Sequence, residues 1–345
     1  MKRFLHIGLW IIAGAIFLLL AGFSAVWINE WKPASRELVY SDSLPGQCLP
    51  DTIRVLTWNI GYAGLGYDMD FFMDGGKQVQ TSPVRAEENL ARIGQFLSAS
   101  DADIILLQEV DRHSRRSYYT DQFTFFQSLL PDYHAFFCYN YKSAFAPVPL
   151  HSPVGRVEAG LAVFSKIRPR EVVRYRYPGG YGFPVRLFHL KSCLMGLSFT
   201  GSGGKDVFIG NTHNTAYDTR GMRGQEMGWM REFLCSENGA VSAVLGGDWN
   251  QYPPGYTPSK EERRNPYFTP LAIPDGFFPA GWEFDYDPHI HSNRYLYEPL
   301  TVSTARTTLD FFLHSPGVEC LRVEAVDLGF RVSDHNPVAA SFVIK

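Results

Sequence analysis

The stretch 246–250, Gly-Gly-Asp-Trp-Asn, constrains this chain more than any other segment. It follows the apolar run 243–245, which has the character of a buried strand, so it delivers a carboxylate and a carboxamide to a strand end. Side chains two residues apart in an extended segment point the same way, so we expect Asp248 and Asn250 to face one pocket. The glycines allow another backbone or a ligand to approach closely. Turns also use Asp and Asn freely, so this run alone does not define a site.

Other polar residues stand at similar places along the chain. Each follows or sits on a short apolar run that resembles a strand, and a sheet would gather such strand ends at one edge. These stretches are Thr57-Trp58-Asn59, Leu107-Gln108-Glu109, Asn211-Thr212-His213, Leu309-Asp310 and Ser333-Asp334-His335. A single Glu or His after a strand is usually a surface or structural residue. Together with the Gly-Gly-Asp-Trp-Asn run, the stretches predict an active site.

In this order, the stretches resemble the motifs of the endonuclease/exonuclease/phosphatase superfamily. That superfamily includes type I deoxyribonucleases, abasic-site endonucleases, inositol polyphosphate 5-phosphatases and neutral sphingomyelinases. The resemblance spans residues 53–344 and implies a four-layer α/β sandwich, in which two mixed β-sheets pack face to face with helices outside. It also implies a site in the cleft at one end of the sandwich. The motifs do not choose a substrate.

The predicted cofactor is Mg²⁺, with Mn²⁺ as an alternative. Carboxylate and carboxamide oxygens with no cysteine nearby are hard ligands that suit these ions rather than zinc. We expect Glu109 to be the strongest direct ligand, with Asn59 beside it, and the resemblance supports both and adds Asp334. Whether one or two ions bind stays open. The five cysteines contain no Cys-x-x-Cys pair, so no zinc motif follows and any disulfide pairing is unreadable.

The resemblance implies catalytic roles for the remaining polar residues of these motifs. His335 is expected to be the general base or its partner, held in the right tautomer by Asp310. In some members of the superfamily the residue at Asp248 orients or deprotonates the attacking water. Asn250 and His213 would contact the scissile phosphate, with His213 as a candidate acid. These roles differ between branches, so the identity of the general base stays open.

The N-terminal segment predicts a membrane anchor. Residues 7–28 contain no charged residue, and their length is roughly the twenty residues that a helix needs to cross a bilayer core. A cleaved signal peptide is the alternative, but its apolar region is usually only about 7 to 15 residues long, and no clear Ala-x-Ala site follows here. Lys2 and Arg3 favour a cytoplasmic N-terminus. We therefore predict a single-pass anchor at 1–31, with the catalytic domain on the extracytoplasmic side of the cell membrane.

The rest of the chain divides into a linker and one catalytic domain. Residues 32–51 contain three prolines and are expected to form a linker rather than a folded element, which leaves 52–345 for the catalytic domain. The aromatic- and proline-rich stretch 253–299 is too long for mere connection and predicts an excursion that faces the substrate. Its His289 and His291 stay outside the predicted site, because paired loop histidines are more often incidental.

Apolar patterning also predicts the main elements of the domain. Strands are expected near 53–58, 103–107, 160–165, 207–212, 243–245, 308–314 and 339–344, with two further strands within 186–200. One helix should start at Ser82-Pro83 and another after Asp218.

The favoured function is a membrane-anchored, Mg²⁺-dependent phosphoester hydrolase. We expect a phosphodiesterase or phosphatase whose partner is a phospholipid head group or a similar phosphoester. The runner-up is an endonuclease or exonuclease acting on nucleic acid, which the net charge of −3 and pI near 6.4 disfavour. The third possibility, a catalytically silent binding module, is opposed by the intact set of site residues. The substrate and the oligomeric state stay open.

Overall fold

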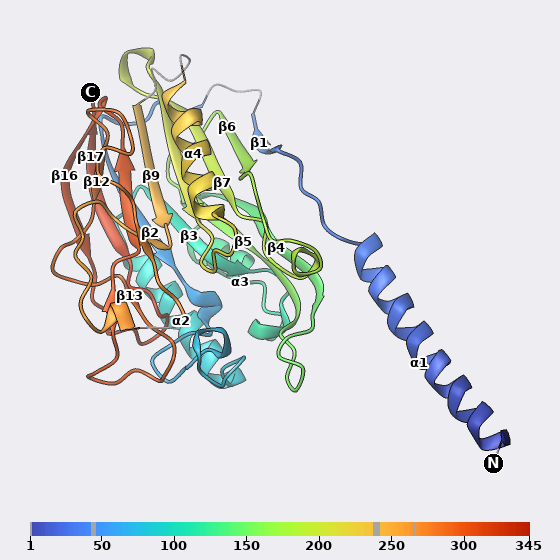
Figure 1. Ribbon diagram of the computed structural model, residues 1–345. Helices are drawn as coiled ribbons and strands as arrows, with labels where there is room; N and C mark the ends of the chain where they lie inside the picture. Colours follow the sequence, from blue (N-terminus) through green and yellow to red (C-terminus); the bar gives the residue numbers. More distant parts are fainter. Residues whose placement is uncertain (1, 43–45, 237–241, 265–266) are drawn as a thin grey trace.

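Two β-sheets packed face to face form the centre of the molecule (Figure 1). The computed structural model describes residues 2–42, 46–236, 242–264 and 267–345. Across the seven-stranded sheet the strands are β1 (Arg36–Ser41), β6 (Glu171–Arg176), β7 (Cys193–Thr200), β8 (Asp206–His213), β9 (Ser242–Asp248), β15 (Asp310–His314) and β12 (Glu283–Asp285). Across the six-stranded sheet they are β16 (Val318–Ala325), β17 (Val338–Ile344), β2 (Thr52–Asn59), β3 (Ile104–Asp111), β5 (Gly155–Ser165) and β4 (His134–Ala146).

Both sheets are mixed. β2 runs parallel to β3 and β8 runs parallel to β9, whereas the other pairs within these two sheets are antiparallel. Two small ladders lie in the connections, β10 (Gln251–Tyr252) with β11 (Leu271–Ala272) and β13 (Asn293–Arg294) with β14 (Arg306–Thr307). The short 3₁₀ segments are η1 (Gly61–Ala63), η2 (Phe72–Asp74), η3 (Arg115–Ser117), η4 (Val185–Leu187), η5 (Ser202–Gly204) and η6 (Glu262–Arg264).

Helices cover the outer faces of the two sheets. α2 (Pro83–Ala99) and α3 (Gln122–Leu129) pack on the six-stranded sheet, and α4 (Met222–Cys235) packs on the seven-stranded sheet. α2 begins where the sequence predicts, because the Ser82 side chain accepts a hydrogen bond from the Arg85 amide and caps the helix. The order helix, sheet, sheet, helix confirms the predicted four-layer sandwich.

The main hydrophobic core lies between the two sheets. It joins side chains such as Leu106 of β3, Val244 of β9 and Phe312 of β15, all fully buried. Phe312 also meets Phe342 of β17 edge to face, with ring centroids 5.4 Å apart. Burial of each such side chain contributes about 1.5–3 kcal/mol, so this layer fixes how the strand ends of the two sheets meet.

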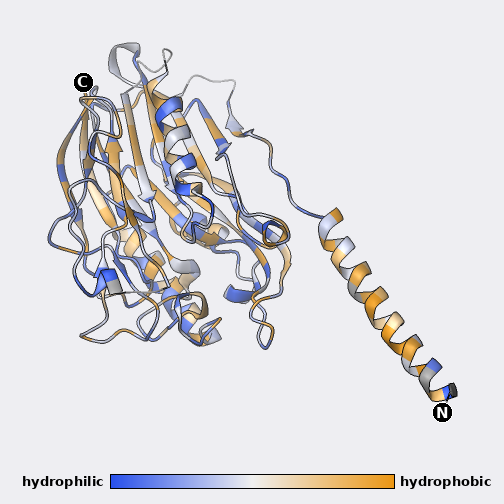
Figure 2. Ribbon diagram, viewed as in Figure 1, coloured by the Kyte–Doolittle hydropathy of each residue, from blue (hydrophilic) through white to orange (hydrophobic). Residues whose placement is uncertain are grey.

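α1 (Lys2–Ile28) extends away from the domain (Figure 1) and is hydrophobic over most of its length (Figure 2). Its segment His6–Ile28 has a mean hydropathy of 2.4 and none of it is buried, so the helix is long and apolar enough to cross a membrane. The predicted N-terminal apolar helix is therefore present. The crossing and the side on which the domain lies remain predictions.

Two expectations from the sequence are wrong. The predicted linker 32–51 contains β1, whose residues pair antiparallel with β6, because the alternating run Arg36–Ser41 places its side chains alternately in and out of the sheet edge. The segment 186–200 supplies one strand, β7, instead of two, and residues Val185–Leu187 form a 3₁₀ turn. No element was expected at α3, β4, β6 or β16. Aromatic residues obscured the patterning of α3 and β4.

Candidate active site

The strand register brings the predicted polar residues to one edge of the sandwich. His213 and Asp248, at the ends of the parallel strands β8 and β9, are direct register partners. Asp248 is also paired with Asp310 at the start of the antiparallel strand β15. In the facing sheet, Asn59 ends β2 beside Gln108 of β3. The core between the sheets then holds these ends opposite each other.

Gly247 permits the close approach of β9 to β8. A Cβ atom at this position would lie only 2.0 Å from the backbone oxygen of Thr212. Any other residue would therefore push the strand end that carries Asp248 away from its neighbour. The glycine before Asp248 is a requirement of the strand packing, as its sequence position suggested.

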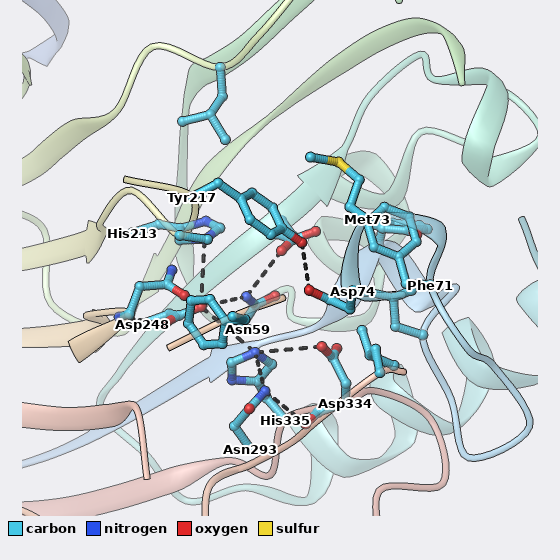
Figure 3. A pocket seen from close by; sticks show the side chains of 18 of the residues that line it. Asn59, Phe71, Met73, Asp74, His213, Tyr217, Asp248, Asn293, Asp334 and His335 are labelled. Carbon is cyan, nitrogen blue, oxygen red and sulfur yellow. Dashed lines mark hydrogen bonds and ion pairs between the residues drawn. The ribbon is translucent and has the colours of Figure 1, made fainter. Parts of the chain in front are cut away.

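A cavity of about 170 Å³ lies at this edge, and seven of the eight predicted site residues line it. The seven are Asn59, Glu109, His213, Asp248, Asn250, Asp334 and His335. Asp310 is the exception, because it is fully buried behind His335. Figure 3 shows both histidines directed toward Asp248.

Glu109 reaches the cavity because β3 is irregular at this point. The register between β3 and β5 shifts between Leu107 and Val110, and Glu109 has a φ of 55°. Such a bulge redirects a side chain, and a left-handed conformation at a non-glycine residue is a strained feature that clusters at functional sites. The amide nitrogen of Asn59 donates to Glu109 Oε1 at 3.2 Å and to Asp248 Oδ2 at 3.0 Å. Asn59 therefore links the two sheets across the cavity.

His335 and Asp310 form the closest pair in the site. His335 Nδ1 lies 2.7 Å from Asp310 Oδ2, and the Ser292 hydroxyl donates to the same carboxylate oxygen at 2.8 Å. Burial by itself lowers the pKa of His335, but the carboxylates of Asp310, Asp334 and Asp248 raise it well above its usual value. The ring is thus oriented at Nδ1 by a carboxylate, while its Nε2 lies at the cavity wall beside the side-chain amide of Asn293.

The second histidine approaches the same carboxylate. His213 Nε2 lies 3.5 Å from Asp248 Oδ2, and His335 Nε2 lies 3.7 Å from that oxygen. Asp248 Oδ1 accepts the Asn250 amide at 2.9 Å, which fixes the carboxylate between the two rings. Asn250 has a φ of 51°, and its side-chain amide donates to the Asn214 carbonyl at 2.8 Å. An Asp flanked by two histidines can orient a water molecule and pass protons on either side.

The carboxylates around Glu109 suit a divalent cation. Burial raises the pKa of Asp334 to about 7, His335 opposes that rise and the negative Glu109 adds to it. A hard cation would compensate these two carboxylates. The side-chain Oδ1 of Asn59 accepts a hydrogen bond from the Gly61 backbone amide at 3.0 Å, so ligation through Asn59 requires its side-chain amide to turn. The residues present therefore fit Mg²⁺ or Mn²⁺.

Several cavity residues had no signal in the sequence. Arg116 lies over the Tyr62 ring at 3.8 Å, and its Nη1 lies 3.7 Å from Glu109 Oε2. The Tyr217 hydroxyl donates to Asp74 at 2.8 Å, and both residues line the same cavity (Figure 3). These residues come from connections between strands, where no periodic pattern identifies which side chain turns inward. The position of Tyr62, three residues after Asn59, was the one available hint.

The fold and the cavity define a class: a four-layer α/β sandwich with carboxylates and histidines gathered in a cleft at one end of the sheets. A sequence profile of the Endonuclease/Exonuclease/phosphatase family matches residues 56–335, so the chain belongs to that family. Members of the family are in general hydrolases of phosphoester or nucleic acid substrates and depend on divalent metals. A search of curated proteins found no match.

Solved structures share the fold at low sequence identity. An endonuclease/exonuclease/phosphatase from Beutenbergia cavernae is 18% identical, with a TM-score of 0.59, over 85% of this chain and 72% of that one. The human Nocturnin catalytic domain with bound sulfate is 17% identical, with a TM-score of 0.53, over 87% and 97% of the two chains. A family protein from Bacteroides thetaiotaomicron is 15% identical, with a TM-score of 0.51, over 85% and 98%.

Proposed function

We propose that this protein is a membrane-anchored, Mg²⁺-dependent phosphodiesterase or phosphatase that acts on a phospholipid head group or a similar phosphoester. The main support is that the connection 177–192 between β6 and β7 contacts the apolar helix α1 and also lines the cleft. Its Phe183 ring contacts Phe23 and Trp27 of α1, at centroid distances of 5.7 and 6.3 Å. Its Tyr181 and His189 line the active-site cavity. A bilayer around α1 would therefore lie close to the cleft.

Charged contacts support the same placement. Glu30, just after α1, lies 3.4 Å from Nε of Arg186 and 3.3 Å from Nζ of Lys191 in this connection, and its side chain is only 5% exposed. The residues that follow the helix are thus packed on the domain rather than extended as a free tether. A cleft held near a bilayer meets membrane-borne substrate at a raised effective concentration.

Exposed apolar side chains stand on the loops around the cleft. Leu150 is 87% exposed and Val148 is 50% exposed in the hairpin between β4 and β5, whose Tyr141 and Val154 line the cavity. Phe183 is 55% exposed in the neighbouring connection. Apolar and aromatic side chains at exposed loop tips suit contact with a lipid surface.

The chain's own residues can carry the proton and orientation steps. Hydrolysis needs an activated water, compensation of charge on the phosphoryl oxygens and a proton for the leaving oxygen. Mg²⁺ held by Glu109 and Asp334, with Asn59 beside them, would compensate the phosphoryl charge. Asp248 would orient the water. His335, positioned by Asp310, would exchange a proton at Nε2.

His213 occupies the other side of Asp248 from His335 and would serve the leaving oxygen. Asn250, on the same strand end, would hold a phosphoryl oxygen through its amide. The pH dependence of kcat in the His335→Ala and His213→Ala variants identifies which histidine acts as the base.

The nuclease alternative finds less support in the cleft. Among the described residues, two Arg or Lys side chains line the cavity, Arg116 and Arg294. Arg116 Nη2 is 2.9 Å from Asp111, and Arg294 donates to the backbone oxygens of Gly66 and Met69 at 2.6 and 3.0 Å. Both cations are committed to internal partners, whereas a nucleic acid backbone requires several cations free to bind phosphates.

The test is a substrate panel for the purified full chain in mixed micelles with Mg²⁺. The panel contains sphingomyelin, glycerophospholipids, inositol phosphates, and single- and double-stranded DNA. We expect a phospholipid to be hydrolysed fastest, with release of the phosphorylated head group or of phosphate. Faster cleavage of DNA would make a nuclease the better supported function. No turnover of any substrate would support a catalytically silent binding module.

Two variants calibrate this panel. His335→Ala should remove turnover of the true substrate, which separates it from a contaminating activity. His134→Gln, an exposed histidine at the start of β4, should leave turnover unchanged. An activity that survives His335→Ala would not belong to this site.

A further inference from the structure

A second group of metal-ligating side chains lies at the far end of β15 from the catalytic Asp310. It contains Glu283 and Asp285 of β12 and His314 of β15, and the Cys320 thiol of β16 lies beside Asp285. We propose that these residues bind a transition-metal ion of the Zn²⁺ type, which ties the edges of the two sheets together. His314 is four residues from Asp310, so this site is about 13 Å along the strand from the catalytic pair.

The strand register points the ligands of the seven-stranded sheet to one face. Glu283 is the direct partner of His314 in the antiparallel pair β12/β15, and Asp285 follows Glu283 by two residues. Cross-strand partners share a face, and so do residues two apart along a strand. His314 meets Phe342 of the other sheet at a ring-centroid distance of 6.0 Å, so this face looks into the space between the sheets.

The His314 ring presents an unused nitrogen to the carboxylates. Its Nδ1 lies 3.0 Å from the Ser315 carbonyl oxygen, which can only accept, so Nδ1 carries a proton. In the neutral ring with this tautomer, the lone pair is at Nε2. His314 is only 4% exposed, and its Nε2 and the Oδ2 of Asp285 both lack a hydrogen-bond partner among the described residues. A metal-bound histidine typically donates its other nitrogen to a carbonyl in this way.

The spacing of the atoms suits a shared ion better than an ion pair. His314 Nε2 lies 3.4 Å from Asp285 Oδ2 and 4.0 Å from Glu283 Oε2. Two ligands at about 2.1 Å from a tetrahedral zinc ion lie about 3.4 Å from each other. A charge-assisted N–H···O bond is shorter, at about 2.7–2.9 Å. The gap between His314 and Asp285 therefore has the width of a coordination site.

Cys320 sets the kind of metal. Its thiol interacts with the Asp285 carboxylate across the open edge of the sandwich, where β16 ends one sheet and β12 ends the other. A thiol with an imidazole favours zinc over magnesium, because sulfur and nitrogen ligands suit the softer ion.

The site has an open side and a structural consequence. The Glu283 side chain is 71% exposed, which gives an ion access from solvent. β12 contains three residues and pairs with one strand of its sheet, β15, so it gains little from the ladder. An ion shared by β12, β15 and β16 would close the edge of the sandwich.

The experiment is a Co²⁺ titration of the full chain in detergent, followed by visible absorption. Co²⁺ reports tetrahedral sites by strong visible bands and thiolate ligation by a near-ultraviolet charge-transfer band. The titration uses the Glu109→Gln variant as its background, because this variant lacks a direct ligand of the active-site ion. The tetrahedral and thiolate bands distinguish Co²⁺ bound by Glu283, Asp285, His314 and Cys320 (the edge site) from Co²⁺ that still binds in the active site. Zn²⁺ added afterwards should displace Co²⁺ and bleach the spectrum, and elemental analysis should find one Zn²⁺ per chain.

Four further variants test the ligands in that background. His314→Gln and Glu283→Gln should each weaken Co²⁺ affinity by at least about tenfold, since even outer partners of a metal site are worth 10–100-fold. Cys320→Ser should remove the charge-transfer band while the visible bands persist in altered form. Cys48→Ser, an exposed cysteine, is the matched control and should change nothing.

Glu283→Gln separates loss of a ligand from loss of the fold, because the Glu283 side chain is exposed and can change while the protein stays folded. The absence of a tetrahedral spectrum in the background variant would overturn the proposal. The proposal would also be overturned if the Glu283→Gln and His314→Gln variants bound Co²⁺ as tightly as the Glu109→Gln background does. A charge-transfer band that survives Cys320→Ser would remove Cys320 from the site.

Discussion

The side-chain amide of Asn293 lies 2.9 Å from Nε2 of His335, on the opposite side of the ring from Asp310. Asn293 also forms an isolated bridge with His335 through the backbone. The imidazole is therefore held from both sides, with a carboxylate at Nδ1 and an amide at Nε2. Proton exchange at Nε2 therefore requires a water or a substrate atom to take the place of the Asn293 amide.

The first prediction is that His335 and Asp310 act as one unit. His335→Ala and Asp310→Ala should each lower kcat by about 10²- to 10⁴-fold, the range that a positioned acid or base contributes. The double variant should be little slower than either single one, because the second change removes a group that no longer has a partner. Steady-state kinetics on the identified substrate measures all three. Strictly multiplicative losses would show that the two residues work separately.

The second prediction concerns the cation. Glu109→Gln should nearly abolish hydrolysis and weaken Mg²⁺ binding, because it removes the charged oxygen that β3 turns into the cavity. Titration calorimetry with Mg²⁺ gives a readout independent of turnover. Glu88→Gln, on the exposed face of α2, is the matched control and should behave like the unchanged protein. Full turnover in excess chelator would refute the metal assignment.

The third prediction is a pH dependence of stability at Glu226 of α4, which is buried and accepts hydrogen bonds from the Thr215 amide at 3.0 Å and hydroxyl at 2.6 Å. Burial raises its pKa from 4.5 to about 7. Between these pH values the folded state binds more protons than the unfolded state, so the free energy of unfolding falls as pH rises. The drop over this window is roughly 3 kcal/mol.

Urea denaturation of the chain in detergent at pH 5, 6 and 8 measures this effect. Glu226→Gln should flatten the curve and be more stable than the unchanged protein at pH 8, because the amide has no charge to bury. Glu232→Gln, an exposed position on the same helix, should keep the original slope. A slope that Glu226→Gln leaves intact would assign the pH dependence to another group.

The sequence predicted the strand ends of the site because each motif joins an apolar run to a polar residue. Asn59, His213 and Asp248 lie where β2, β8 and β9 end, and register then forces them together. Asn293 could not be found this way. It lies within the long stretch 253–299, in a two-residue strand that the antiparallel partner β14 completes.

The edge cluster shows a second limit. Its side chains, Glu283, Asp285 and His314 with Cys320 beside Asp285, come from three strands with no motif spacing, and they meet because β12 and β16 are the edge strands of their sheets. The predicted linker failed for a related reason: Arg36–Ser41 becomes a strand through its pairing with β6, a partner about 135 residues later in the chain. Pairing partners so distant leave no local pattern.

The last prediction concerns the position of the catalytic domain relative to the membrane, and it decides between a lipid and a nucleic acid as the substrate. Residues 29–35 separate α1 from β1, and even fully extended they reach at most about 25 Å. If α1 spans the membrane, the domain cannot leave the bilayer surface. Deleting residues 1–28 should then lower activity on vesicle-embedded substrate far more than on a soluble phosphodiester. An unrelated membrane helix in place of 1–28 should restore much of the loss, because the benefit comes from tethering.

The side of the membrane follows from protease access. Lys2 and Arg3 favour a cytoplasmic N-terminus, so protease added to intact spheroplasts should degrade the catalytic domain. A cytoplasmic protein of the same cells is the control for membrane integrity and should stay whole. A domain on the outer side meets lipid head groups and is separated from chromosomal DNA. Protection of the domain from the protease would place it in the cytoplasm, where chromosomal DNA is accessible, and the nuclease would become the better proposal.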